Sequence, residues 1–216
     1  MPRTTPATLS RRMIVDTALQ LMDTDGYAAF SMPKLGDVLG IRTPSLYHHF
    51  RDRAEIMAEV ARRVVRETQL PERRSGDHWT EYFVELSTNF RATILRHRNA
   101  APVLVQFLPR DIMTSLYETA AVLLNEVAEL PKSQHVLIID GLERLTIGSA
   151  LVESSLESGA APGSARSAFP NVDAERQPHL AEAVRSNERD AEQLFIASVR
   201  AFLAGATNGT PALRAP

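Results

Sequence analysis

Apolar residues recur along most of this chain at spacings of three and four, at which side chains share one face of an α-helix. Residues 11–25 show the pattern most simply. Their apolar stripe consists of Ile14, Val15, Ala18, Leu21 and Met22. A strict alternation of apolar and polar positions would indicate a β-strand, but it nowhere persists beyond four residues. The pattern therefore predicts an all-α fold.

Residues that favour helix ends divide the first part of the chain into short helices. The helix that begins at residue 11 ends before Gly26, and Ser31 is the predicted N-cap of a helix that stops at Gly40. Thr43 is the predicted cap of the next short helix. A longer helix over residues 52–68 follows. In the helix after Ser31, the predicted inward residues are Leu35, Val38 and Leu39.

Beyond Pro71 the composition changes, and the stretch PERRSGDH is typical of a linker. We therefore predict two domains, over residues 1–68 and 69–216. The second domain contains longer helical segments, and Ser186 is the predicted cap of the last one. These segments cover residues 78–97, 101–108, 111–129, 134–158 and 187–205, with a shorter helix over 175–184.

Charge is distributed unevenly, although the whole protein carries a formal net charge of only −2. Residues 1–66 contain ten basic and seven acidic side chains, a net charge of +3, and the rest of the chain has a net charge of −5. A basic N-terminal part on an acidic body is the pattern expected when that part binds a polyanion. The distribution favours nucleic acid as a partner.

Several classes of chemistry have no support in the sequence. The chain contains no cysteine, which excludes disulfides, thiolate metal sites and cysteine nucleophiles. Its six histidines form no HxxxH or HExxH pair, and there is no phosphate-binding glycine loop or GxSxG motif. We predict no catalytic residue, metal or cofactor, and therefore not an enzyme. No apolar run approaches the roughly 20 residues that span a bilayer, and residues 1–12 lack the apolar core of a signal peptide, so we expect a cytoplasmic protein without a membrane partner.

Residues 31–50, SMPKLGDVLGIRTPSLYHHF, combine two short helices with a tight turn, which is the arrangement of a helix-turn-helix. Gly40 permits the positive φ of the turn, and Gly36 permits close approach of the two helices. The inward residues of the pair are Leu35, Leu39, Ile41, Leu46 and Phe50. On the outer side of the second helix lie groups that can hydrogen-bond base edges and phosphates. They are Arg42, Thr43, Ser45, Tyr47, His48 and His49.

The stretch from Arg11 to about Val65 resembles the DNA-binding domain of the TetR family of transcriptional regulators. The motifs that carry the likeness are DGYAAFSM after the first helix, KLGDVLGI in the next, and TPSLYHHFRDRAEI across the recognition helix and the start of the fourth. The resemblance implies an all-α fold with an N-terminal helix-turn-helix DNA-binding domain and a larger C-terminal helical domain for ligand binding and dimerisation. It also implies a homodimer that represses genes until a small molecule binds the C-terminal domain.

The family pattern further implies roles for single residues of the DNA-binding domain. Thr43, Pro44 and Ser45 would face bases, and Tyr47 would reach a phosphate. Pro33 stands where some relatives place a base-reading arginine, so the operator sequence of those relatives cannot be transferred. The candidate DNA-binding residues are Ser31, Lys34, Arg42, Thr43, Pro44, Ser45, Tyr47, His48, His49 and Arg53. Of these, His48 would touch bases, and Ser31, His49 and Arg53 would lie near the phosphate backbone.

The C-terminal domain carries a concentration of aromatic residues in its first helices, and ligand sites are mainly apolar with a few polar groups. We expect the segments from 78 to 158 to enclose a pocket, although a solid core would show the same residues. The candidate lining residues are Phe83, Phe90, Ile94, Phe107, Tyr117, His135, Leu142 and Thr146. Arg144 is the only Lys or Arg between Lys132 and Ser164, which favours an apolar or weakly polar effector.

Two stripes on the last long helices predict a dimer interface, because the family's dimers form a four-helix bundle from such helices. Gly141 and Gly148 would let another backbone approach closely. The candidate interface residues are Gly141, Leu145, Gly148, Val152, Leu194, Phe195, Ser198 and Phe202. The alternative is that both stripes belong to the core of one chain.

These features together predict a transcription regulator. The simplest form is a repressor that binds a palindromic double-stranded DNA operator as a homodimer and is released by a small apolar effector. The alternatives are a ligand-independent regulator or an activator and, from a different class, a helical small-molecule carrier or enzyme with a degenerate DNA-binding head. The absence of acid–base pairs at motif spacing argues against the enzyme.

Overall fold

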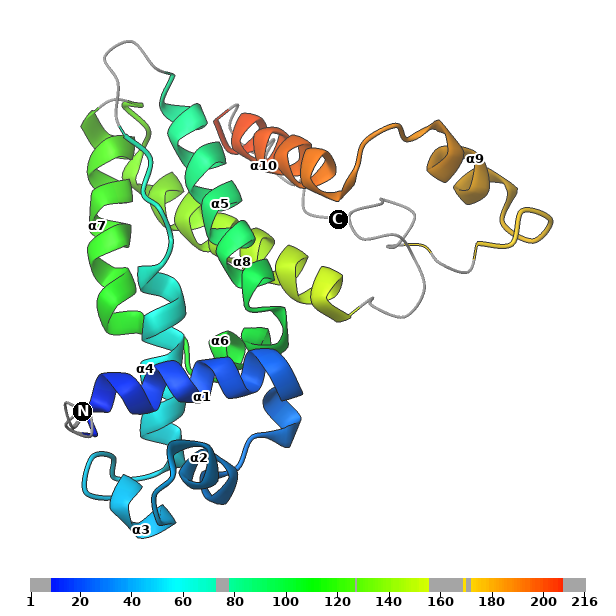
Figure 1. The fold of residues 1–216 in the computed structure, drawn as a ribbon. Helices are drawn as coiled ribbons and strands as arrows, with labels where there is room; N and C mark the ends of the chain where they lie inside the picture. The colour runs from blue at the N-terminus through cyan, green and yellow to red at the C-terminus, as the bar shows by residue number, and fades with distance from the viewer. Residues whose placement is uncertain (1–8, 73–77, 127, 156–168, 170–171, 208–216) are drawn as a thin grey trace, which may run out of the picture. The chain divides into compact units, whose positions relative to one another are not determined.

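The computed structural model describes residues 9–72, 78–126, 128–155, 169 and 172–207. Within these residues all regular structure is helical (Figure 1), as the apolar periodicity predicted. The α-helices and the two 3₁₀ helices (η) are α1 (Arg11–Asp25), η1 (Tyr27–Ala29), α2 (Met32–Leu39), α3 (Thr43–Leu46), α4 (Arg53–Arg66), α5 (Trp79–Arg96), η2 (Arg98–Ala100), α6 (Ala101–Gln106), α7 (Arg110–Glu126), α8 (Lys132–Ser155), α9 (Pro178–Ser186) and α10 (Ala191–Thr207).

The chain forms two compact units. The N-terminal unit comprises Met1–Glu67 and His97–Arg110, and the C-terminal unit comprises Thr68–Arg96 and Asp111–Pro216. The 97–110 segment belongs to the N-terminal unit because η2 packs against α1 and α6 packs against α4. Sequence patterns gave no sign of this, since the predicted domains, 1–68 and 69–216, are each continuous along the chain.

Side-chain caps set the starts of three helices in the N-terminal unit. Ser10, Ser31 and Asp52 each accept a hydrogen bond from the backbone N–H three residues later, at 3.2, 3.3 and 2.8 Å. Such bonds satisfy N–H groups that have no partner within the helix. α3 has no side-chain cap, and its N-cap is Arg42, whose backbone is extended. The prediction that Thr43 caps α3 was therefore wrong, because Thr43 is already the first helical residue.

Two glycines allow the turn between α2 and α3. Gly40 ends α2 in the left-handed conformation, with φ 67° and ψ 28°, which side chains with a Cβ adopt at a cost. A Cβ on Gly36 would lie 3.0 Å from the carbonyl oxygen of Ile41. Both roles agree with those predicted for these glycines. With a Cβ at position 36, the turn would have to move away from α2 by a few tenths of an ångström.

Apolar side chains from α1, α2, α3 and α4 form the core of the N-terminal unit. Leu46 of α3 and Phe50 just after it are 0% and 1% exposed. Val38 is 58% exposed, so the prediction that it points inward was wrong. α2 instead buries Met32, Leu35 and Gly36. The other fully buried residues of this core include Ile14, Ala18, Met22, Ile56, Met57 and Val60.

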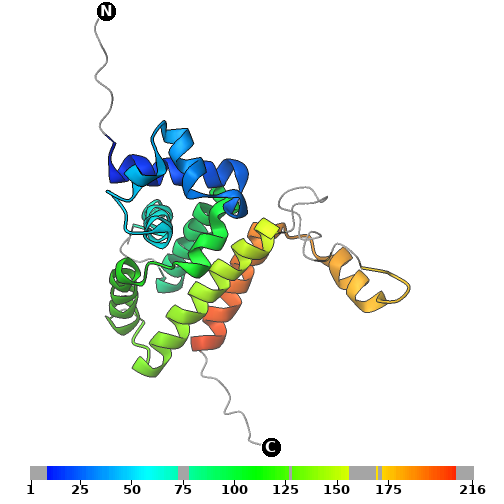
Figure 2. The ribbon, with the colours of Figure 1, turned by 90° about the horizontal axis from the view of Figure 1, so that it is seen from below.

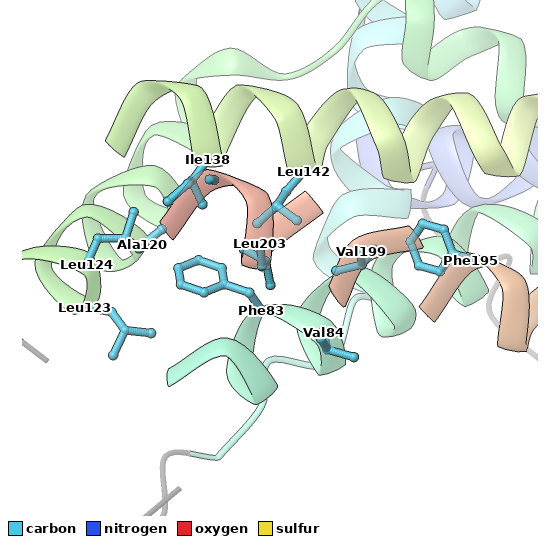
Figure 3. Close-up of a cluster of buried hydrophobic side chains, with 11 residues drawn as sticks. Phe83, Val84, Ala120, Leu123, Leu124, Ile138, Leu142, Phe195, Val199 and Leu203 are labelled. Atoms are coloured by element: carbon cyan, nitrogen blue, oxygen red, sulfur yellow. The ribbon is translucent and has the colours of Figure 1, made fainter. Parts of the chain in front are cut away.

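The C-terminal unit is held together by α5, which packs against both α8 and α10. Figure 2 shows α8 and α10 side by side, in agreement with their contacts. Figure 3 shows Phe83 of α5 surrounded by apolar side chains from α7, α8 and α10. The buried cluster consists of Phe83, Val84, Ala120, Leu123, Leu124, Ile138, Leu142, Phe195, Val199, Leu203 and Ala206.

The last helix begins later than predicted. The Asp190 carboxylate accepts the Gln193 N–H at 2.8 Å, and the Gln193 side chain accepts the Asp190 N–H at 3.1 Å. This reciprocal pair is a capping box, and it starts α10 at Ala191. Ser186, the predicted cap, is instead the last residue of α9. The serine was misassigned because Asp190 offers the same chemistry a few residues later.

We predict that Gly40→Ala lowers the free energy of unfolding by about 1 kcal/mol. The reason is that alanine is strained at a positive φ, whereas glycine adopts it freely. Gly205→Ala is the control, since φ is not positive there and a Cβ would contact nothing within 4 Å. Chemical denaturation of both variants and the wild type measures the difference. Equal stability of Gly40→Ala and the wild type would contradict the turn described here.

Candidate functional site

The predicted DNA-binding residues of α3 lie on the side of the helix that is open to solvent. The exposed ones are Arg42, Pro44, Tyr47 and His48, and the half-buried ones are Thr43, Ser45 and His49. Tyr47 has 51% of its surface accessible, whereas Leu46 beside it is fully buried. The outer side of α3 therefore presents hydroxyls, imidazoles and a guanidinium, groups that bind base edges and phosphates.

Two further candidates lie at the start of α2. The Ser31 hydroxyl accepts the Lys34 N–H, so its own proton stays available for donation. The ammonium of Lys34 lies 2.9 Å from a carboxylate oxygen of Asp25. A phosphate at this position would therefore compete with Asp25 for Lys34, whereas Ser31 could donate to it directly.

Arg53, the first residue of α4, is held between two aromatic rings. Its guanidinium carbon lies 5.2 Å from the ring centroid of Tyr27 and 5.5 Å from that of Phe30. Contacts of this kind are attractive because the cation faces the negative side of the ring. They restrict the side chain while the planar N–H edge keeps the geometry that suits a phosphate.

Arg11 is a supporting residue that sequence reasoning missed. Its guanidinium donates to the backbone carbonyl of His49, lies 2.7 Å from a carboxylate oxygen of Glu55, and covers the ring of Phe50 with 4.1 Å to the centroid. A single side chain of α1 thus joins the end of α3 to the start of α4. No local pattern marked it, because His49 and Glu55 lie 38 and 44 residues further along the chain.

The two acids at the start of α4 are stabilised in their ionised form. The pKa of Asp52 is lowered mainly by the hydrogen bond from the Glu55 N–H, and further by the Arg51 side chain. The pKa of Glu55 is lowered mainly by the hydrogen bond from the Arg51 N–H, and further by Arg11. Both carboxylates accept these hydrogen bonds more strongly when ionised, so their negative charge strengthens the connection between α3 and α4.

The predicted ligand-lining residues of α5 and α8 are all buried, and two of them belong to one cluster. Phe83 and Leu142 belong to the cluster of Figure 3, and Ile94 is fully buried. Thr146 is 2% exposed and its hydroxyl donates to the Leu142 carbonyl at 2.7 Å. Phe90 is 9% exposed. That these residues line a pocket stays a prediction.

The remaining ligand candidates are more dispersed. The hydroxyl of Tyr117 donates to the carboxylate of Glu143, which joins α7 to α8. A ring nitrogen of His135 lies 3.0 Å from the Leu130 carbonyl oxygen. Phe107 lies directly after α6, in the N-terminal unit, whereas the other candidates belong to the C-terminal unit. The expectation that Phe107 belongs with them rested on its position along the chain.

Arg91 is a buried cation that the sequence pattern did not assign to this region. Its side chain is 6% exposed, donates to the Ser149 hydroxyl at 3.0 Å and pairs with the carboxylate of Glu153. The guanidinium carbon also lies 5.2 Å from the ring centroid of Phe195. The region around Ser149 therefore contains a basic group, which comes from α5 rather than from the neighbouring sequence of α8.

The predicted dimer stripes divide into residues that pack within the chain and residues that do not. Phe195 is 4% exposed and belongs to the buried core, and a Cβ on Gly141 would overlap the ring of Phe202. These contacts show Phe195 and Gly141 packed within one chain, which was the alternative to an interface. The open positions are different: a Cβ on Gly148 would meet nothing within 4 Å, and Val152 is 56% exposed. Leu145, Leu194 and Phe202 are half-buried and Ser198 is exposed.

A charged cleft of about 460 Å³ lies between α1 and α4 in the N-terminal unit. Its lining residues are Arg11, Arg12, Val15, Asp16, Glu59, Arg63 and Arg66. Arg63 and Asp16 form an ion pair of 2.9 Å within it. This lining differs from the apolar pocket predicted for the C-terminal domain.

Two classes of site find no support in the part of the chain that the structure describes. There, no three His, Cys, Asp or Glu side chains are grouped so that they could hold a metal ion. Nor is any helix within the described ranges both long and apolar enough to cross a bilayer.

We predict that acidic pH lowers the stability of the fold at the start of α4. A carboxylate whose pKa is lowered by folding stabilises the fold above its unfolded-state pKa, and this contribution is lost as the pH falls through the folded-state pKa. Asp52 and Glu55 both have this sign, so stability should fall as the pH drops below about 4. Denaturation of the wild type and of the double variant Asp52→Asn, Glu55→Gln, at several pH values, measures this loss of stability. The double variant should be less stable at neutral pH and lose less on acidification; an unchanged acid dependence would contradict this role.

Comparison with protein families covers both units. The family described as "Bacterial regulatory proteins, tetR family" matches residues 14–60. The family described as "Tetracyclin repressor-like, C-terminal domain" matches residues 70–208. The tetracycline repressor protein class D of Escherichia coli is 25% identical over 203 residues, which are 92% of this chain and 89% of that protein.

Solved structures of similar proteins extend the likeness to the fold. The Streptomyces coelicolor TetR family protein ActR in complex with actinorhodin gives a TM-score of 0.76 at 27% identity, covering 94% of this chain and 99% of that one. ActR in complex with (S)-DNPA gives 0.75 at 26% identity, covering 94% and 100%. The family match across both units and the helix-turn-helix geometry lead to one conclusion: the chain belongs to the TetR family of transcriptional regulators, non-enzymatic proteins with an N-terminal DNA-binding domain and a C-terminal ligand-binding domain.

Proposed function

We propose that this protein is a ligand-responsive repressor that binds a palindromic operator as a homodimer and is released from it by a small apolar effector in the cytoplasm. The observation that carries the DNA-binding part is the outer side of α3. It exposes Tyr47 and His48 while Leu46 and Phe50 are buried beneath it. A helix so anchored can enter the major groove without changing its orientation in the unit.

The proposed contacts divide into two kinds. Thr43 and Ser45 in α3 and His48 just after it read base edges, because short hydroxyls and imidazoles can hydrogen-bond the base edges in the major groove. Tyr47 and Arg53 bind phosphates, and phosphate contacts fix the register of the protein without carrying sequence information. The stacking of Arg53 on Tyr27 and Phe30 supports this role, since it restrains the guanidinium before DNA arrives.

A palindromic operator needs two recognition helices about 34 Å apart, and hence a dimer. We place the interface on the faces of α8 and α10 that are open in this chain. Gly148 and Val152 on α8 and Ser198 on α10 support this choice, because no side chain of the described chain covers them. Phe195 takes no part, since it already belongs to the core.

The proposed effector is an apolar or weakly polar molecule bound in the C-terminal unit. The aromatic and aliphatic side chains of α5 and α8 supply apolar surface, and Arg91 is already paired with Glu153. Relatives named as complexes with actinorhodin and with (S)-DNPA support a small-molecule effector. To shift the protein from mostly bound to mostly released, the effector must favour the released state by about 5.5 kcal/mol.

We predict that the two kinds of contact respond differently to substitution. A duplex selected from a random library by the wild-type protein serves as the operator. Tyr47→Phe and Arg53→Ala should weaken binding to this duplex and to its base-substituted variants alike, because phosphates are common to all of them. Ser45→Ala and His48→Ala should change the preference among the variants by about 1–3 kcal/mol per lost base contact. Equal weakening by all four substitutions, measured by fluorescence anisotropy, would show that the residues are sorted wrongly.

We predict that Gly148→Leu with Val152→Asp yields monomers that lose operator binding. The leucine fills the space that the proposed partner helix occupies, and the aspartate places a charge in an apolar interface. Val136→Asp is the matched control, because Val136 is an exposed valine on a different side of α8, with 73% of its surface accessible. Sedimentation analysis and circular dichroism report assembly and folding. A folded double variant that remains dimeric would place the interface elsewhere.

A further inference from the structure

His97 lies between two carboxylates from different helices of the N-terminal unit. Its Nδ1 is 2.7 Å from Oδ2 of Asp23, near the end of α1, and its Nε2 is 3.0 Å from Oε2 of Glu67, just after α4. The side chains of His97, Asp23 and Glu67 are 15%, 30% and 23% exposed. We call these three residues the His97 link.

The chemistry of the His97 link determines where its protons are. An ionised carboxylate only accepts hydrogen bonds, and a neutral imidazole has one N–H and one bare nitrogen. Both contacts of His97 can therefore be hydrogen bonds only when both ring nitrogens carry a proton. The positions of the two carboxylates suit an imidazolium, which would donate one charge-assisted bond to each of them.

The His97 link fastens the 97–110 segment to the helices that support α3. The side-chain amide of Asn99 donates to the Asp23 carbonyl at 2.7 Å, and the Tyr27 hydroxyl donates to the Gln106 side chain at 2.8 Å. Tyr27 is also one of the two rings on which Arg53 stacks. His97 thus contacts the end of α1, and the chain continues from there through η1 to Tyr27, which contacts the arginine proposed to bind phosphate.

We propose that His97 in its protonated form is a positioning residue for DNA binding, so that operator affinity falls when His97 loses its proton. Histidine is the side chain whose charge changes most readily between about pH 5 and 8. Without the proton, one hydrogen bond of the His97 link is lost and two carboxylates face a neutral ring. The end of α1 is then held less firmly against the end of α4, and so is η1, which carries the Tyr27 ring on which Arg53 stacks.

Two further cations, Arg63 and Arg98, lie near the link. Arg63 pairs with the second oxygen of Glu67 at 2.6 Å, and it also pairs with Asp16. Arg98 follows His97 in the chain, and Oδ1 of Asp23 has no hydrogen-bond partner. The unit stays folded, because α1 and α4 remain joined by their buried core and by the Arg11–Glu55 and Arg63–Asp16 pairs. The change therefore appears in the geometry of DNA binding.

The test rests on the proposed operator binding and uses the full-length protein with the duplex selected by the wild type. His48 and His49 face the same DNA and also gain charge at low pH, so both are first replaced in a His48→Gln, His49→Gln background. In this background we expect operator affinity to fall about tenfold between about pH 6 and pH 8.5 at constant ionic strength. Adding His97→Gln should give the weaker affinity at both pH values, because glutamine cannot become charged. His179→Gln, at an exposed position on α9, should leave the pH dependence intact.

A second measurement needs no DNA and separates failure of this inference from failure of the proposed function. In ¹⁵N-labelled wild-type protein, the ring signals of His97 should show both nitrogens protonated at about pH 6.5 and Glu67→Gln should weaken that state. If no duplex is selected but the ring is an imidazolium, the operator proposal fails and the proton assignment stands. A neutral His97 ring at that pH, or an unchanged pH dependence of affinity after His97→Gln, would overturn the inference. If His97→Gln does not fold, Glu67→Gln is tested in its place, and an undiminished pH dependence in that variant has the same consequence.

Discussion

The anchoring of α3 by buried side chains is the constraint on which the DNA-binding unit depends. Isolated helices shorter than about 12 residues are marginal in water, and α3 is a four-residue helix without a side-chain cap. Its orientation comes from Leu46 and Phe50, which are almost completely inaccessible, and from the close approach that Gly36 permits. With these side chains buried, the opposite side of α3 faces solvent. That side carries the hydroxyls and imidazoles.

Around this core, charged side chains join α1, α3 and α4 at defined positions, in addition to the apolar contacts. Arg11 joins α1 to the end of α3 and to Glu55, Asp16 pairs with Arg63 of α4, and His97 lies between Asp23 and Glu67. Exposed ion pairs contribute little to stability. Their geometry nevertheless restricts how α1 and α4 can be arranged, and α1 and α4 support the recognition helix.

In the C-terminal unit, the buried cation Arg91 is satisfied where helices contact one another. Arg91 is compensated by Glu153, Ser149 and the ring of Phe195, and removal of one partner from such a buried pair is costly. Phe83 and Phe195 fill the space between α5, α8 and α10, and Phe202 covers Gly141. What this packing leaves open is the surface around Gly148 and Val152, and the proposed dimer uses that surface.

The sequence by itself determined the helices, their apolar faces and the helix-turn-helix, because these depend on local spacing and on residues such as Ser31, Gly40 and Asp52 that act within a few positions. It also indicated the outward residues of α3, since Leu46 and Phe50 were recognisable as inward. Local spacing failed before α10, where Ser186 and Asp190 offer the same capping chemistry, and at α3, which begins without any side-chain cap.

Only the tertiary structure decided which distant residues meet. Arg11 with Glu55, Arg91 with Glu153, and His97 with Asp23 and Glu67 are separated by tens of residues, and no periodicity connects them. The same holds for Phe195, whose stripe suited either a core or an interface until α5 and α8 were seen to cover it. The physical reason is that helix periodicity specifies a buried face but not its partner, which the packing of the whole chain selects.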